Sequence, residues 1–197
     1  MKKSAAIIIA VFSVMIFACN NKQEKTTATS PTIKSKNTDS FNLAFDNVLA
    51  QYDSLKTAFI NWDTVAINKS ATVLEQQLLN VPYEQIKDDE QATKANSIAQ
   101  NAAGAVHNIS SQDSISNKRR IFYTASESIY NLAKAVDYDK AILYHKKCPM
   151  AFNGDQEGWW FSESKKIDNP YFGKFHPKYK NAMLTCGSVE DSVDNMQ

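Results

Sequence analysis

Residues Phe41 to Phe59 read FNLAFDNVLAQYDSLKTAF, and this stretch decides the fold class. Its large apolar residues recur at steps of three and four, at Phe41, Phe45, Val48, Leu49, Tyr52, Leu55 and Phe59. That spacing places them on one stripe of an α-helix, which must be buried against other elements. Asp39 or Ser40 is expected to cap its N-terminus, because a side-chain oxygen there can accept a backbone N–H.

Three further segments show the same helical period. Helices are expected over residues 63–79, 83–107 and 117–136, with Gly104 weakening the end of the third. Pro82 ends the second, because the residue before a proline is pushed out of the helical region. Four amphipathic helices joined by short connections predict a mainly α fold, built as an antiparallel four-helix bundle.

The helical period stops after Tyr138. Short strand-like runs follow over residues 141–144 and 158–161, separated by the turn sequence Asn153-Gly154-Asp155. Residues 188–197 are acidic and polar and are expected to fray. We therefore predict one domain over residues 40–190, in which a small irregular β-containing segment, residues 141–187, follows the helices.

The N-terminal residues have the features of an export signal. A charged start precedes an apolar run too short to span a bilayer, and residues 1–18 are predicted to be removed. Ile16-Phe17-Ala18-Cys19 resembles the bacterial lipoprotein signal, which implies a lipid on Cys19; an ordinary secretory signal cut nearby is the alternative. Residues 19–39 are polar and predict a flexible tether. The chain is expected in the bacterial cell envelope, facing the periplasm and held to a membrane by its lipid.

Charge and motifs narrow the classes of function. The formal charge is +1, from 22 basic and 21 acidic residues, without a long basic run, so no nucleic-acid partner is expected. The sequence has no Ser–His–Asp order, no glycine-rich phosphate loop and no pair of histidines at helical spacing. The chain is therefore expected not to be an enzyme.

The residues suited to a soft metal lie in the terminal segment. The two cysteines after Cys19 are Cys148 and Cys186, and each has a methionine nearby, Met150 and Met183. On an extended strand Cys148 and Met150 point to one side, and one helical turn brings Met183 and Cys186 together. A set of thiolates and thioethers is typical of copper(I) sites.

Nitrogen ligands and a dry wall are available in the same segment. His145 precedes Cys148 by three residues, and His176 lies in the stretch 174–182. Both are candidate ligands. Large aromatic side chains would exclude water from such a site, and the candidate wall residues are Trp159, Trp160, Tyr171 and Phe172.

A disulfide between Cys148 and Cys186 explains the same residues. Two thiols in an exported protein are either paired or ligands. Closing that loop would stabilise the fold by about 4 kcal/mol in the chain-entropy model. The methionines and tryptophans would then be core residues. The residues alone favour the disulfide, and a thiol redox role has little support without a Cys-x-x-Cys pattern.

Four motifs in the terminal segment resemble a family of exported bacterial domains of unknown function, often lipoproteins. They stand as Cys148-Pro149-Met150, Trp160-Phe161-Ser162, Asn169-Pro170-Tyr171-Phe172-Gly173 and Met183-Leu184-Thr185-Cys186-Gly187. Similar domains are appended to the periplasmic adaptor subunits of copper and silver efflux pumps. The likeness covers residues 41–187, including Arg119, Phe122 and Ser126, and implies a helical bundle and heavy-metal handling. Residues 174–182 depart from the pattern by separating the third motif from the fourth.

Two hypotheses of function follow. In the first, which the resemblance favours, Cys148 and Cys186 bind copper(I), or less favourably zinc or silver. The chain then buffers the metal or passes it to an efflux adaptor or another periplasmic metal-handling protein. In the second, the chain is a non-catalytic structural or interaction lipoprotein with a Cys148–Cys186 disulfide. A dependence on Met150 would favour copper, because zinc sites use Cys and His without thioethers.

Overall fold

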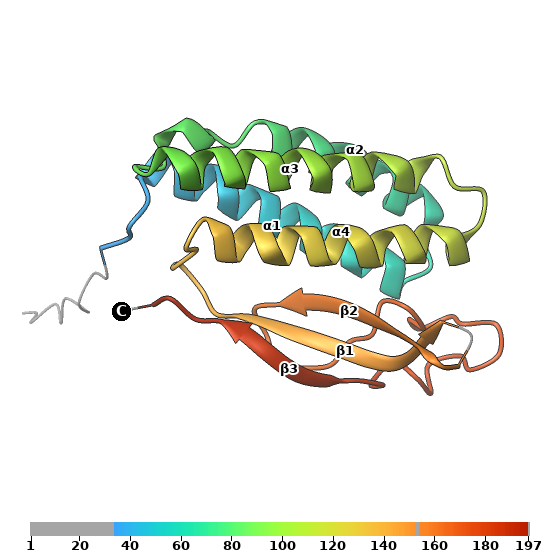
Figure 1. Cartoon of the computed structure of the whole chain (residues 1–197). Coiled ribbons are helices and arrows are strands. Elements are labelled where there is room, and N and C mark those ends of the chain that lie inside the picture. The colour runs from blue at the N-terminus through green and yellow to red at the C-terminus, as the bar shows by residue number, and fades with distance from the viewer. Residues whose placement is uncertain (1–33, 153, 197) are drawn as a thin grey trace, which may run out of the picture. The chain divides into compact units, whose positions relative to one another are not determined.

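A computed structural model describes residues 34–152 and 154–196. In this part of the chain the fold is mainly helical, with four α-helices followed by a three-stranded antiparallel sheet (Figure 1). The elements are α1 (Asp39–Ile60), α2 (Thr64–Leu79), the 3₁₀ turn η1 (Tyr83–Gln85), α3 (Asp89–Ser110), α4 (Ile115–Ala135), β1 (Leu143–Phe152), β2 (Gln156–Ser162) and β3 (Ser188–Val193). The predicted signal peptide, Cys19 and most of the predicted tether lie outside the described residues.

Each α-helix begins after a side chain that accepts a backbone N–H of the first turn. The caps are Thr38, Asp63, Asp88 and Ser114. Asp39 and Ser40, predicted as alternative caps of the first helix, lie inside α1 instead. That prediction was wrong because the threonine just before them already supplies the acceptor.

The third predicted helix starts six residues too early. Residues 83–85 form the separate turn η1, and α3 begins only at Asp89. Asp88 caps this helix, and acidic residues in its first turn favour the positive end of the helix dipole. The helix then continues through Gly104 to Ser110, so it extends three residues beyond its predicted end at residue 107.

The helices pack side by side in sequence order, α1 on α2, α2 on α3 and α3 on α4. Figure 1 shows α1 and α4 next to the sheet, with α2 and α3 farther from it. The apolar stripe predicted for the first helix is confirmed, because all of its members are buried: Phe41, Phe45, Val48, Leu49, Tyr52, Leu55 and Phe59.

The sheet is larger than the sequence predicted. β1 lies between β2 and β3 and pairs antiparallel with both. It runs from Leu143 through the Cys-Pro-Met motif to Phe152, and Gly154 lies in the connection to β2 where a turn was predicted. Fraying from residue 188 was wrong, since Ser188–Val193 form β3 and Val193 is buried.

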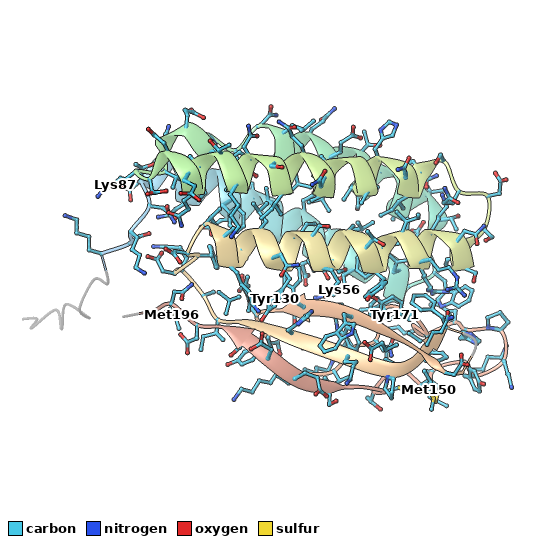
Figure 2. All side chains as sticks on the ribbon, in the orientation of Figure 1. Lys56, Lys87, Tyr130, Met150, Tyr171 and Met196 are labelled. Atoms are coloured by element: carbon cyan, nitrogen blue, oxygen red, sulfur yellow. The ribbon has the colours of Figure 1, made fainter. Side chains whose placement is uncertain are left out.

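Phe161 joins the sheet to the helices. Its ring stacks on Tyr52 of α1 with centroids 4.0 Å apart and lies 5.8 Å from the ring of Tyr130 of α4. The Tyr52 hydroxyl accepts the Phe161 N–H at 3.3 Å and shares a 2.9 Å hydrogen bond with Ser126 Oγ. Tyr130 is seen between α4 and the sheet in Figure 2. The second motif is therefore part of the main core.

The residues just before α1 are fixed to the end of α4. Ser35 Oγ donates to Asp139 Oδ1 at 2.7 Å, and the Lys36 N–H donates to Asp139 Oδ2 at 2.8 Å. Asn37 Nδ2 donates to the Val136 carbonyl at 2.8 Å. These bonds fix where the chain enters the first helix.

Candidate functional site

The fold brings Cys148 and Cys186 into direct contact. Cys148 lies on β1 and is fully buried, whereas Cys186 lies just before β3 and is partly buried. Their Sγ atoms are 2.8 Å apart, although 38 residues separate them in the sequence. Both are free thiols in the structure. The predicted convergence of these two residues is therefore present.

Asn169 builds the turn that presents Cys186. This asparagine is fully buried, its Nδ2 donates to the Cys186 carbonyl at 2.7 Å, and its N–H donates to the Leu184 carbonyl at 2.8 Å. Its Oδ1 accepts the N–H groups of Tyr171 and Phe172. Sequence analysis placed Asn169 in a motif without giving it a role, and its buried polar side chain is the signal that identifies one.

Two glycines allow the close approach at the cysteines. Gly158 pairs with Cys148 across the sheet, and a Cβ there would lie 2.7 Å from the Tyr171 ring. Gly187 follows Cys186 with φ of 137°, and a Cβ there would lie 2.8 Å from the Trp160 ring. Trp160 and Tyr171, both predicted wall residues, thus lie beside the cysteine pair.

The surroundings favour an uncharged sulfur pair. Burial raises the pKa of the Cys186 thiol, and the contact with Cys148 raises it further. A thiolate at this position would be a partly buried negative charge in contact with a second sulfur. Two thiols or a disulfide at this place cost less free energy than a pair that includes a thiolate.

His145 lies apart from the cysteines. It pairs with Phe161 across the sheet and faces the helices, whereas Cys148 is three residues further on and therefore faces the other way. The Nε2 of His145 lies 2.7 Å from Glu127 Oε1, and its ring lies between Tyr130 and Trp159 with centroids 4.0 and 4.5 Å away. Trp159, predicted as a wall residue, belongs to this second group.

Met150 and His176 form part of a third place. Both line a pocket of about 580 Å³, and Met150, at the end of β1, is 39% exposed (Figure 2). Nδ1 of His176 accepts the N–H groups of Lys178 and Tyr179, each at 3.2 Å. Burial, Arg119 and Lys178 lower the pKa of His176.

Of the four candidate ligands other than the cysteines, Met183 is the one that lies in the same turn as Cys186. The Cys186 N–H donates to the Met183 carbonyl at 3.1 Å, so the two residues close one turn, as predicted. Met183 is partly buried and packs on the core, while Phe172, the last predicted wall residue, lies in the third place with His176, ring centroids 5.4 Å apart. The six candidate ligands thus fall into three groups.

A larger pocket, which sequence analysis missed, lies between α1 and the end of β2. It has a volume of about 720 Å³ and is lined in part by Lys146, which is 1% exposed to solvent. The Nζ of Lys146 donates to Ser162 Oγ at 2.6 Å and to the Lys166 carbonyl at 2.7 Å. Burial, and then repulsion by Lys56, lower the pKa of Lys146 to about 8. Strand alternation in Lys146-Lys147 would have predicted that one lysine points inward.

The described residues contain neither a group of typical metal ligands nor a helix suited to span a membrane. Within residues 34–152 and 154–196, no three or more His, Cys, Asp and Glu side chains are grouped so that they could hold a metal ion. In the same part of the chain, no helix is long and apolar enough to cross a membrane.

Comparison with known proteins bears on the helical part. Residues 48–141 match the family model described as "Protein of unknown function (DUF3347)". No curated protein and no solved structure matches the chain. The matched residues run from α1 to just before β1, so the cysteine pair and the four motifs lie beyond the match. The helices of this chain are similar to a domain family of unknown function.

Proposed function

We propose that the chain is a non-catalytic interaction lipoprotein of the bacterial envelope, locked by a Cys148–Cys186 disulfide. In this proposal the helices form an antiparallel bundle, a lipid on Cys19 holds it to a membrane, and residues 19–39 act as tether. The observation that supports it is the direct contact of two buried or partly buried sulfur atoms, 2.8 Å apart. Because similar domains are appended to efflux adaptor subunits, we propose such an adaptor, or another periplasmic metal-handling protein, as the partner that it contacts.

The distance between the sulfurs favours a bond over a shared metal ion. Two thiolates on one tetrahedral ion lie about 3.8 Å apart when each metal–sulfur bond is about 2.3 Å. A linear copper(I) site spreads them further. The sulfurs would have to separate to admit an ion, whereas a disulfide needs a closer approach and leaves no buried charge.

The disulfide forms by thiol–disulfide exchange. A thiolate of one cysteine attacks the disulfide of an envelope thiol oxidoreductase, and the second cysteine then displaces that enzyme from the mixed disulfide. The oxidoreductase takes up the two electrons, and the two thiol protons pass to its thiols or to water. The bond would close a 38-residue separation and stabilise the fold by about 4 kcal/mol on the chain-entropy model.

Copper(I) binding at the same pair is the second candidate. It is favoured by Met183, which the turn at Cys186 holds next to the cysteines in the chain. Thiolate and thioether ligands select copper(I), and silver or zinc would bind less favourably. The protein would then buffer the ion or pass it to an efflux partner.

Mass spectrometry of the full chain separates the two candidates. The protein is recovered from the envelope of cells grown with added copper, without reductant, and its cysteine peptides are mapped after alkylation. We expect Cys148 and Cys186 in one linked peptide pair, two hydrogens lighter than the thiols, and no bound metal. Alkylation of both cysteines before reduction, with one copper on the native protein, would overturn the disulfide and establish the second candidate.

Thermal unfolding gives an independent check. Adding a reductant should lower the stability of the wild type and leave the Cys148→Ser/Cys186→Ser variant unchanged. A reductant effect of equal size in both proteins would contradict the proposal.

A further inference from the structure

The pocket that contains Met150 and His176 is positively charged. It lies between the start of α4, the end of β1 and the loop 172–179, and has a volume of about 580 Å³. Arg119, Arg120 and Lys178 line it, and among the described residues its lining includes no Asp or Glu. The larger pocket beside α1 differs, because its four lysines are matched by four acidic residues. The smaller pocket should therefore attract anions and repel cations.

Arg119 is a buried cation without a negative partner. It is 5% exposed, its Nε donates to the Pro170 carbonyl at 3.0 Å, and its Nη2 donates to the Phe59 carbonyl at 3.2 Å. Its guanidinium carbon lies 4.0 Å from the centroid of the Trp62 ring. No carboxylate of the described residues forms an ion pair with it. A guanidinium buried in this way is costly unless an anion is nearby.

Arg120 and the N-terminus of α4 add to the positive electrostatic potential of the pocket. Arg120 lies with its guanidinium carbon 4.8 Å from the centroid of the Phe152 ring, and its Nη1 donates to Gln156 Oε1, which is uncharged. Ile115 and Ser116, the first two residues of α4, also line the pocket. Unpaired N–H groups at a helix start carry partial positive charge and attract anions.

The walls of the pocket are aromatic. Trp62, Phe152, Phe172 and Tyr179 line it, and the Phe172 and Tyr179 ring centroids lie 5.5 Å apart in an edge-on arrangement. Arg119 and Arg120 lie over the Trp62 and Phe152 rings, whereas Phe172 and Tyr179 offer aromatic surface to a flat apolar group. The positive charge of the lining would repel a metal cation. Met150 and His176 are therefore better suited to line the pocket than to coordinate a metal ion.

We propose that this pocket binds a small organic anion in which a carboxylate or phosphate is carried on a flat apolar body. Arg120, Lys178 and the start of α4 hold the anionic group, and the aromatic walls hold the body. Arg119 fixes the pocket by joining the Asn-Pro-Tyr-Phe-Gly motif to α1 and supplies further positive charge. Neither cysteine lines this pocket, and the anion proposal does not require the proposed disulfide to be formed.

The test measures binding of simple probes to the full chain. Phenyl phosphate and benzoate present the two anionic groups on one ring, phenol and benzylammonium present the neutral and cationic forms, and inorganic phosphate lacks the body. Titration calorimetry or ligand-observed NMR gives the affinities. We expect phenyl phosphate or benzoate to bind at least about ten-fold more tightly than phenol, inorganic phosphate and benzylammonium.

Two double variants locate the binding. Arg120→Gln/Lys178→Gln should weaken binding of the anionic probe at least about ten-fold, because two charged contacts are lost. Lys87→Gln/Lys94→Gln removes the same charge from exposed positions on and before α3, and Lys87 lies at the other end of the fold from Met150 in Figure 2. The control should bind as the wild type does. Equal losses in both variants, or phenol binding as tightly as the anions, would overturn the proposal.

Discussion

Replacing Lys146 by methionine should change how stability depends on pH. The side chain is buried, and its ammonium has two neutral acceptors, Ser162 Oγ and the Lys166 carbonyl. The charged groups that act on it are Lys56 and Asp53 of α1 and Asp168 of the loop after β2. Burial and Lys56 outweigh the two carboxylates, so the folded protein holds this proton less tightly than the unfolded chain.

The direction of the effect follows from proton linkage. The pKa of Lys146 falls from 10.5 to about 8 in the folded state. Below pH 8 both states are protonated and the folded state bears the full cost of the buried charge. Between pH 8 and 10.5 the unfolded state binds more protons, so stability rises with pH. The full pKa difference corresponds to roughly 3.4 kcal/mol, and we expect about 1–2 kcal/mol because solvent in the pocket screens the ammonium.

Urea unfolding at pH 7, 8, 9 and 10, followed by tryptophan fluorescence, measures this. The difference in unfolding free energy between wild type and Lys146→Met should move in favour of the wild type by about 1–2 kcal/mol across the range. Groups that titrate alike in both proteins, including the cysteines, cancel in the difference. The control is Lys140→Met, an exposed lysine of the same pocket, which should stay parallel to the wild type. A constant difference for Lys146→Met, within about 0.3 kcal/mol, would refute the reasoning.

Five further substitutions test the packing by the same unfolding assay. Phe161→Ala should cost about 3–5 kcal/mol because a buried ring is lost, while Phe175→Ala, at a residue 63% exposed, should stay within about 0.5 kcal/mol; equal effects would contradict the docking of the sheet. Gly173→Ala should destabilise by more than about 1 kcal/mol, because φ is 61° and a Cβ would lie 2.5 Å from a backbone carbonyl oxygen of α1. Gly104→Ala, in an open helical position, should stabilise by about 0.5–1 kcal/mol. Arg119→Lys should cost about 1–3 kcal/mol, since one ammonium does not replace a guanidinium that bonds two carbonyls; wild-type stability would show that these bonds are unimportant.

The helices were predictable because their signals are local. The stripe of α1 and the cap of α2 follow from residues within a few positions of each other. The start of α3 was missed because Tyr83 to Asp88 contains helix-forming residues, and the cap at Asp88 prevailed over that weak propensity. β3 gave no local signal, since it is a polar edge strand with one buried residue, Val193. It is defined by its pairing with β1, about 45 positions earlier in the chain.

The candidate sites were predictable to different degrees. The contact between Cys148 and Cys186 could be predicted, because a chain that is predicted to be exported and has two thiols in one motif segment has few ways to arrange them. The separation of His145 from them follows from strand alternation, which was applied to Cys148 and Met150 but not to His145. The two pockets could not be predicted, because each is lined by segments more than one hundred positions apart.

Residues 163–187 contribute to the cysteine pair, to the larger pocket that contains Lys146 and to the smaller pocket that contains Met150 and His176. This segment supplies Cys186 to the sulfur pair and the Lys166 carbonyl to Lys146. It also supplies Lys178, Phe172 and Tyr179 to the smaller pocket. Because Asn169 and Cys186 are joined by a hydrogen bond, a bond between the sulfurs would restrain the segment near its start as well as near its end. The proposed Cys148–Cys186 disulfide would therefore also restrain one wall of each pocket. If it does, reduction should weaken binding of the anionic probe even though neither cysteine lines the pocket.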